Sequence, residues 1–497
     1  MQDNAAEQAR IANVHPPGWE NPRAKDRYHM VVVGGGTGGL VTAAIAAGLG
    51  ATTALIERHW MGGDCLNVGC VPSKALLRAA RAWHAAATAH ERFGGPDVAG
   101  QRDFAAAMRR MRQIRADISG LDSASRFRDL GVDVFFGQAR FTGVDTIAVD
   151  GQDLCFRSAV IATGTRPAIP PIPGLAESGF LTNETIFSLA EVPRRLAVIG
   201  GGPIGCELAQ AFARFGSAVT VVEQGDTLLG KDDPEAAGVV SAALARDGVR
   251  LLTSTTMERV VGSNPVVLHV TRNGRSEQVE ADAILVASGR VPNVEDLGLD
   301  AAGVDFDERR VITDGRLRTT NRRVFAVGDI TALSPFTHAA DAHARMVVQN
   351  ALFFGRKKVT DLVIPWCTYT QPELAHVGMK WEAVNAGGDE FEAVTIPLHD
   401  VDRARLDGDD EGFLRVHLHK GSDRIVAATL VADHAGDIIA QLSMAMQQGL
   451  GLSAIGAAIF PYPTHAEVIR KAADAWRKRK LTPRVLGLFR FFFRIVR

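Results

Sequence analysis

Two cysteines within residues 62–74, GGDCLNVGCVPSK, have the type and spacing of a redox pair. Cys65 and Cys70 are five residues apart, a spacing that separates side chains by about 140° on a regular helix. A disulfide between them therefore requires an irregular turn, which Gly69 and Pro72 can provide. A position near a helix N-terminus would also lower the pKa of a thiol, which favours redox exchange over inert packing.

Buried thiols and a metal site are the alternatives for this pair. Zinc normally takes four ligands at closer spacing, and no second CxxC or histidine partner is evident, so a metal site is disfavoured. The other three cysteines, Cys155, Cys206 and Cys367, lie in apolar sequence and are interpreted as packing residues.

The pair follows the first of two copies of a nucleotide-binding pattern. Each copy has a strand, a GxGxxG turn, a helix, and a second strand that ends in a glutamate. The first copy has strands at 30–33 and 52–56 and ends at Glu57, whereas the second has strands at 196–199 and 218–222 and ends at Glu223. The glycines are Gly34, Gly36 and Gly39 in the first copy and Gly200, Gly202 and Gly205 in the second.

The chemistry of dinucleotides explains this pattern. The first glycine permits a tight turn, the second lets the backbone approach the pyrophosphate, and the third lets the helix pack on the strand. The helix N-terminus presents unpaired N–H groups to the phosphates, and the glutamate accepts hydrogen bonds from the adenosine ribose. Two copies predict two dinucleotides, which we interpret as a flavin and a nicotinamide brought together for hydride transfer.

The composition excludes several other classes of protein. The chain has 497 residues, of which 46% are hydrophobic and 22% charged, so we expect a folded protein of several domains. Its net charge of −1 provides no global field toward nucleic acid or membrane, and we expect no nucleic-acid partner. The odd number of cysteines and a polar N-terminus without a signal-peptide core predict a cytoplasmic protein.

With these motifs in place, the sequence resembles the flavin-containing pyridine nucleotide-disulfide oxidoreductases over residues 28–475. The most specific segment is GGDCLNVGCVPSK, which closely resembles the redox motif of dihydrolipoamide dehydrogenase and mercuric reductase. The resemblance implies FAD on the first copy, NAD(P) on the second, and a homodimer in which the C-terminal domain completes the active site of the partner subunit.

The expected fold class is α/β, with two Rossmann-like dinucleotide-binding domains for FAD and NAD(P) and a C-terminal α+β dimerisation domain. The expected boundaries are 1–27 for an N-terminal surface arm, 28–165 and 296–360 for the FAD-binding domain, 166–295 for the NAD(P)-binding domain, 361–475 for the dimerisation domain, and 476–497 for a basic amphipathic tail.

The resemblance also implies roles at the redox centre. Cys70 would be the thiolate in contact with the flavin, and Cys65 the thiol that exchanges with substrate. Lys74 would stand near flavin N5 and pair with Glu207, where a cation stabilises a reduced, anionic flavin.

The same resemblance assigns residues to the cofactors. Gly34, Gly36, Gly39 and Glu57 would hold the adenosine diphosphate half of FAD. Asp329 would bind its ribityl chain, and Ala340 would lie near the pyrimidine edge. Ala139, Gly164 and Gly289 complete the set expected to bind cofactor.

Residues 460–467, FPYPTHAE, bear on the subtype. In dihydrolipoamide dehydrogenases a histidine followed by a glutamate protonates the exchange thiol of the other subunit. Here Tyr462 stands at the histidine position and Glu467 at that of the glutamate. Tyrosine is a poor base near neutral pH, so lipoamide oxidation should be crippled, with His465 as an alternative base.

Mercuric reductases resemble this chain more closely at that position, because they have a tyrosine there that attends the metal. Two features depart from them. The sequence lacks a C-terminal cysteine pair and the N-terminal metal-trapping domain.

The predicted function is reduction by NADH, through FAD and a Cys65–Cys70 disulfide, of a metal ion such as Hg(II), a small disulfide or another soft electrophile. Glu223 would repel a 2′-phosphate, and residues 224–229 contain no arginine, so NADH is expected over NADPH. The alternatives are a dihydrolipoamide dehydrogenase-like enzyme and a membrane-peripheral NADH dehydrogenase that uses flavin without the disulfide.

The end of the chain is both basic and apolar. Residues 475–497 contain eight basic residues and no acidic one. If residues 484–497 are helical, Arg490, Arg494 and Arg497 lie within about 60° and apolar side chains cover the rest. Residues 481–497 therefore suit contact with a membrane surface, on its inner face, and packing on the dimer is the alternative.

Overall fold

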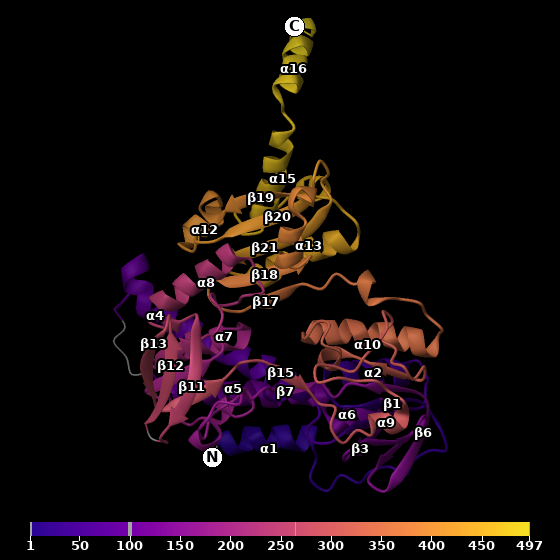
Figure 1. The fold of residues 1–497 in the computed structure, drawn as a ribbon. Helices are drawn as coiled ribbons and strands as arrows, with labels where there is room; N and C mark the ends of the chain where they lie inside the picture. Colours follow the sequence, from indigo (N-terminus) through magenta and orange to yellow (C-terminus); the bar gives the residue numbers. More distant parts are fainter. Residues whose placement is uncertain (1, 98–101, 264, 497) are drawn as a thin grey trace.

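The computed structural model describes residues 2–97, 102–263 and 265–496 of the chain. It has the predicted α/β class. Two sheets that are largely parallel lie side by side, and an antiparallel sheet with its helices lies above them in Figure 1.

The first sheet has a buried apolar centre. Strand β1 (Tyr28–Val33) pairs in parallel with its neighbours on both sides, and residues 30–33 form the continuous apolar run typical of a strand covered on both faces. The other strands are β2 (Thr53–Glu57), β3 (Val132–Phe136), β6 (Gln152–Ile161), β16 (Val324–Ala326) and the hairpin β4 (Arg140–Gly143) and β5 (Thr146–Val149). Helices α2 (Thr37–Gly48) and α10 (Thr337–Leu352) pack together on this part.

The second part repeats this plan. Its parallel sheet has the order β10-β9-β8-β14, and a three-stranded antiparallel sheet, β11-β12-β13, accompanies it. The parallel strands are β8 (Arg195–Ile199), β9 (Ala218–Val222), β10 (Arg250–Leu252) and β14 (Ala283–Val286), with helices α7 (Pro203–Phe215) and α8 (Pro234–Arg246). The antiparallel strands are β11 (Thr255–Val261), β12 (Val266–Arg272) and β13 (Arg275–Ala281).

A short two-stranded ribbon joins these two parts. Strand β7 (Thr165–Pro167) leads out of the first part, and β15 (Arg290–Pro292) leads back. The two strands are antiparallel, with Arg290 opposite Pro167.

The C-terminal part is α+β, as predicted. Its sheet has the order β17-β18-β21-β20-β19, and every neighbouring pair is antiparallel. The strands are β17 (Trp366–Thr368), β18 (Glu373–Gly378), β19 (Phe391–Pro397), β20 (Phe413–His419) and β21 (Ile425–Ala432), and helices α13 (Ala435–Gln447) and α15 (Glu467–Arg479) pack on them.

The N-terminal segment differs from the expected surface arm. It contains helix α1 (Gln2–Val14), which packs against α5 (Phe104–Ser119) along the lower edge of Figure 1. Arg10 and Val14 are buried. The prediction was wrong because it relied on the polar composition, and a buried guanidinium is stable where ionic and amide partners satisfy it.

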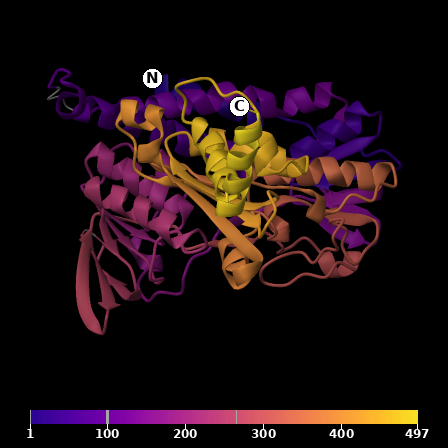
Figure 2. The ribbon, with the colours of Figure 1, turned by 90° about the horizontal axis from the view of Figure 1, so that it is seen from above.

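The basic tail contains helix α16 (Pro483–Ile495), the conformation that its amphipathic pattern presupposed, and Arg497 lies outside the described residues. None of the residues of α16 is buried. Figure 1 shows it continuing from α15 away from the body of the molecule, and in Figure 2, seen from above, it lies in front of the C-terminal part. Among the described residues, no helix is long and apolar enough to cross a membrane.

Candidate active site

The two cysteines lie on separate helices. Cys65 lies in α3 (Gly63–Asn67), and Cys70 is the first residue of α4 (Cys70–Phe93). The chain breaks between them at Gly69, which has φ −125° and ψ −113°. The break brings the two thiols close enough that each shifts the pKa of the other, and both are unbridged in this structure. The irregular turn was predicted correctly at Gly69, whereas Pro72 lies inside the first turn of α4.

The two thiols differ in acidity. A hydrogen bond from the Cys65 thiol lowers the pKa of Cys70 to about 6, and the Thr337 hydroxyl and the Lys74 cation act in the same direction against burial. The pKa of Cys65 is raised, because its hydrogen bond to Cys70 and its own burial favour the protonated form. Near neutral pH the pair therefore consists of a Cys70 thiolate and a Cys65 thiol.

Thr337 belongs to this centre and was not predicted. It is the first residue of α10, and its Oγ1 lies 3.4 Å from Sγ of Cys70. The two residues are 267 positions apart, so no local pattern in the sequence could have paired them.

Lys74 joins three parts of the molecule. Its Nζ lies 2.7 Å from Oε2 of Glu207 on α7, the partner that the family resemblance implied. The Nζ also lies 4.8 Å from the ring centre of Tyr369, whose backbone N–H donates to Oε1 of Glu207 at 2.8 Å. Burial would lower the pKa of Lys74, but the Glu207 carboxylate outweighs it and the pKa is raised, so Lys74 is a cation.

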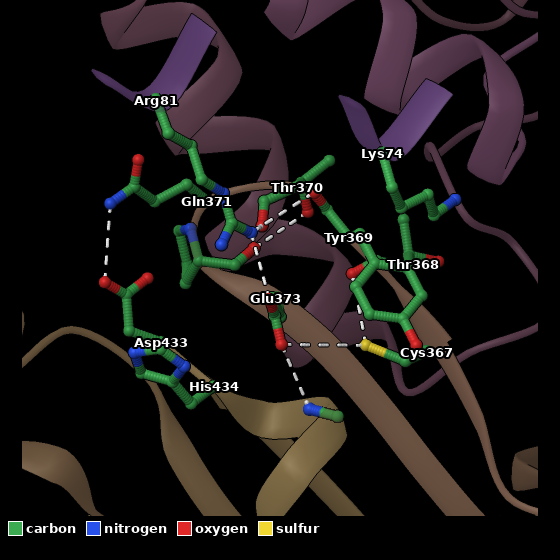
Figure 3. Close-up of polar contacts among 12 residues, drawn as sticks. Lys74, Arg81, Cys367, Thr368, Tyr369, Thr370, Gln371, Glu373, Asp433 and His434 are labelled. Atoms are coloured by element: carbon green, nitrogen blue, oxygen red, sulfur yellow. Dashed lines mark hydrogen bonds and ion pairs between the residues drawn. The ribbon is translucent and has the colours of Figure 1, made fainter. Parts of the chain in front are cut away.

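The loop after β17 supports this contact. Figure 3 shows Tyr369 beside Lys74, and Glu373 between the sulfur of Cys367 and the guanidinium of Arg81. Arg81 and Lys74 both lie on α4, so the C-terminal part contacts the helix that begins at Cys70. Burial raises the pKa of Cys367, which agrees with its interpretation as a packing residue.

The two glycine fingerprints have nearly the same geometry. Gly34 and Gly200 begin the turns with φ of +108° and +110°. A Cβ on Gly39 would collide with the backbone oxygen of Gly34, and a Cβ on Gly205 with that of Gly200. Gly36 and Gly202 are the N-caps of α2 and α7.

The two glutamates are held in the same way. The backbone N–H of Gly35 donates to Glu57, and that of Gly201 donates to Glu223, each at 2.6 Å. Each carboxylate therefore lies at the end of its second strand, beside the glycine turn, where a dinucleotide ribose binds.

A small cavity of about 60 Å³, open to solvent, lies beside the first fingerprint. Its lining includes Gly34, Glu57, Ala139 and Thr163. A glycine turn at a helix N-terminus, a ribose-binding carboxylate and an adjoining cavity fit the adenosine end of FAD, so the residues present suit that cofactor.

The other residues assigned to cofactor lie around the same part. Asp329 follows β16 and accepts a hydrogen bond from Oγ1 of Thr165 at 3.3 Å. Ala340 is buried on α10, where its methyl group faces Gly38 and Gly328. Gly164 and Gly289 flank the two-stranded ribbon and both have positive φ.

Arg290 was not predicted as a site residue. It forms an ion pair at 2.6 Å with Asp64, the residue before Cys65, and its Nε donates to Oγ1 of Thr165 at 2.7 Å. Burial raises the pKa of Asp64, which Arg290 partly opposes. The ribbon is thereby tied to the helix that carries the first cysteine.

Tyr462, His465 and Glu467 lie in the C-terminal part, and no contact among the described residues links them to Cys65 or Cys70 within one chain. The hydroxyl of exposed Tyr462 donates to Asp402 at 3.0 Å, and this bond raises the pKa of Tyr462. Nε2 of His465 lies 3.0 Å from Asp407. Glu467 is buried and pairs with Arg470.

Comparison with known proteins identifies the family. Residues 28–355 match the family described as pyridine nucleotide-disulphide oxidoreductase. The chain belongs to this family. Residues 364–473 match its dimerisation domain. The resemblance inferred from the sequence is confirmed.

Relatives with different substrates are similar to this chain. Mercuric reductase of Staphylococcus aureus is 34% identical over 461 residues, which cover 91% of this chain and 83% of that protein. Dihydrolipoyl dehydrogenase of Thermus scotoductus is 33% identical over 463 residues, which cover 91% and 98%.

Solved structures give a third relative. The Cu(II) complex of the HOCl-induced flavoprotein disulfide reductase RclA from Escherichia coli has a TM-score of 0.81 and 29% identity, covering 91% of this chain and all of that one. The protein is thus an oxidoreductase of a family that uses FAD and NAD(P)H, and the dimerisation domain supports a homodimer.

Proposed function

We propose that this enzyme uses NADH to reduce a thiol-reactive metal ion, Hg(II) or Cu(II), through the Cys65–Cys70 pair, with a small disulfide as the alternative acceptor. The observation that carries the proposal is the placement of the pair: Cys65 lies on α3, and Cys70 is the first residue of α4 with its Sγ 3.4 Å from Oγ1 of Thr337. Two adjacent sulfur ligands suit soft metal ions. The relatives named mercuric reductase and the Cu(II) complex of RclA support this class of acceptor.

The residues of the chain divide the work as follows. Bound FAD would transfer electrons between the nicotinamide and the cysteine pair. Cys70 supplies the thiolate, and Cys65 holds its proton until a metal ion displaces it. Lys74 places a positive charge near Cys70. With Hg(II), one NADH gives two electrons, and the net products are NAD⁺, one proton and Hg(0).

The properties of Tyr462 favour a metal ion over lipoamide as the substrate. Its pKa is raised by the hydrogen bond to Asp402, so its hydroxyl is neutral near pH 7 and serves poorly as a base for a thiol. A neutral hydroxyl can still donate to, or lie beside, a metal-bound group. Nε2 of His465 is bonded to Asp407 and its Nδ1 is buried, so neither ring nitrogen is open to a thiol, which disfavours it as a replacement base.

An anaerobic assay with NADH and a panel of acceptors tests the proposal: Hg(II), Cu(II), lipoamide, glutathione disulfide and a quinone. We expect metal reduction to be fast in the natural enzyme and to fall at least about 100-fold in Cys65→Ser and in Cys70→Ser. Cys155→Ser, which alters a thiol on β6, is the matched control. Full metal or quinone reduction by the Cys65 and Cys70 variants would instead support a flavin dehydrogenase that does not need the pair.

NADH is the proposed nicotinamide. Both carboxylate oxygens of Glu223 accept backbone hydrogen bonds, from Gly201 and Gly225. A carboxylate fixed in this way favours a ribose 2′-hydroxyl and repels a 2′-phosphate.

We also propose that residues 481–497 contact an anionic membrane surface. Helix α16 starts with its own cap, because Oγ1 of Thr482 accepts from the N–H of Val485, and it carries exposed Phe489, Phe491 and Phe492. Arg490 and Arg494 form the narrow polar side of the helix, and basic residues beside an apolar face suit anionic lipid.

Vesicle co-sedimentation tests this contact. The full chain should sediment with vesicles that contain phosphatidylglycerol and much less with phosphatidylcholine alone, whereas a chain ending at residue 480 should remain in the supernatant in both cases. Equal sedimentation of the two chains with vesicles would refute membrane contact. Membrane contact would also be refuted if the truncation changed the oligomeric mass of the protein but not its binding to vesicles.

A further inference from the structure

The segment that carries the two cysteines is contacted by a helix that precedes the residues matched to the family. Helix α1 precedes residue 28, where that match begins. Its Arg10 is only 2% exposed, lies 4.5 Å above the ring of Trp60, and donates a hydrogen bond from NH1 to Oδ1 of Asn67. Asn67 is the last residue of α3, between Cys65 and the break at Gly69.

Asn67 is itself fully engaged. Its amide donates to the backbone oxygens of Gly63 at 2.8 Å and Met61 at 3.0 Å, which closes the last turn of α3. Its side-chain oxygen accepts from Arg10, and its backbone oxygen accepts from Arg115 at 2.8 Å. A buried amide with all of these partners has one orientation available.

A single carboxylate joins the two arginines. Glu7 on α1 accepts from Arg10 and, at 2.7 Å, from NH2 of Arg115 on α5. The backbone adds a further contact, because the N–H of Met61 donates to the oxygen of Val14 at 3.0 Å. Two helices therefore hold the same short segment, and Arg10 is the side chain of α1 that contacts Asn67.

We propose that Arg10 is a positioning residue for the Cys65–Cys70 pair. It fixes Asn67, and so keeps the end of α3 in place while the two sulfurs pass between dithiol and disulfide. The inference rests on the proposed redox function of the pair. Holding two reacting groups in contact raises their effective concentration, so the clamp favours closure of the disulfide.

Equilibration of the FAD-loaded enzyme in glutathione buffers, without NADH, measures this effect directly. The fraction of Cys65–Cys70 disulfide is read by alkylation and peptide mass. We expect Arg10→Ala to lower the equilibrium constant for disulfide formation roughly tenfold, which corresponds to about 30 mV for a two-electron couple. Arg109→Ala, which alters an exposed arginine on α5, should leave it unchanged.

Two further variants separate positioning from general loosening. Val14→Ala removes a buried side chain of α1 without touching Asn67, so it should lower the melting temperature but leave the disulfide equilibrium within twofold. Arg10→Lys keeps the charge but not the planar fork that reaches both Glu7 and Asn67, so it should show a smaller shift in the same direction as Arg10→Ala. If Arg10→Ala fails to retain FAD, the disulfide equilibrium is measured on Arg10→Lys instead.

Two outcomes would overturn the inference: an equilibrium in the Arg10 variants within twofold of the natural enzyme, or an equal shift in Val14→Ala. A natural enzyme that forms no Cys65–Cys70 disulfide in any of the buffers would refute the proposed function instead. The two failures are therefore distinguishable.

Discussion

Nζ of Lys74 lies 2.7 Å from Oε2 of Glu207, so one ion pair connects the helix that begins at Cys70 with the first helix of the second fingerprint. Glu207 is buried and Lys74 is partly exposed. The pair has opposite effects on the neighbouring thiol: Lys74 lowers the pKa of Cys70, and Glu207 raises it.

Substitutions of the two partners should therefore move the pKa of Cys70 in opposite directions. Lys74→Met removes the cation, and we expect the pKa to rise from about 6 by roughly one pH unit. Glu207→Gln removes the anion, and the pKa should fall. Ultraviolet thiolate absorbance against pH measures both, with Lys25→Met as a control on an exposed lysine paired with Asp133. Shifts of the same sign in the two variants would contradict this account.

The rate of Cys70 alkylation by iodoacetamide should depend on pH with an inflection near 6. Only the thiolate reacts, and the folded-state pKa lies below that of a free thiol, so the rate should rise through pH 6 and level off above pH 7. Cys65→Ala removes the hydrogen bond that contributes most, and its inflection should move upward. An inflection near pH 8.5 in the natural enzyme would show that the pair is not acid-shifted.

Glu223→Gln should weaken the preference for NADH. The substitution keeps the shape but removes the charge that repels a 2′-phosphate, so the ratio of kcat/KM for NADH over NADPH should fall roughly tenfold, equivalent to about 1.4 kcal/mol. Asp226→Asn alters an exposed carboxylate in the same loop and should leave the ratio unchanged. A natural enzyme that prefers NADPH would overturn the assignment before any variant is made.

Tyr462→His should increase dihydrolipoamide oxidation with NAD⁺, by roughly 10- to 100-fold, because histidine is a suitable base near neutral pH. Metal reduction should not gain from this change. His465→Gln is the companion variant, since it should leave the low natural activity unaltered. Rapid turnover of dihydrolipoamide by the natural enzyme, abolished in His465→Gln, would show that His465 is the base.

Local patterns in the sequence predicted the parts of the site that local structure determines. Each fingerprint lies within one strand-turn-helix-strand unit, so glycine spacing and the following glutamate were sufficient. An irregular turn followed from the cysteine spacing with Gly69 and Pro72 as the residues that could provide it, and the break lies at Gly69. The pairing of Lys74 with Glu207 spans 133 positions and was available only through resemblance to the family.

The contacts that the sequence analysis did not predict either join distant segments of the chain or involve a buried charge. Thr337 and Tyr369 reach Cys70 and Lys74 from distant segments, and no periodicity connects them. Arg10 was missed for another reason: hydropathy treats an arginine as a surface residue, yet its partners Glu7 and Asn67 make burial stable.

The antiparallel ribbon of β7 and β15 has a topological consequence. Because Pro167 and Arg290 are opposite each other, residues 168–289 leave and return at one point. Residues 168–289 are therefore an insertion within the first nucleotide-binding part, and the two ends of the insertion are adjacent. Excising the insertion and bridging the gap with a few residues would leave the sheet of the first part uninterrupted, as expected if one nucleotide-binding unit had once been inserted into another.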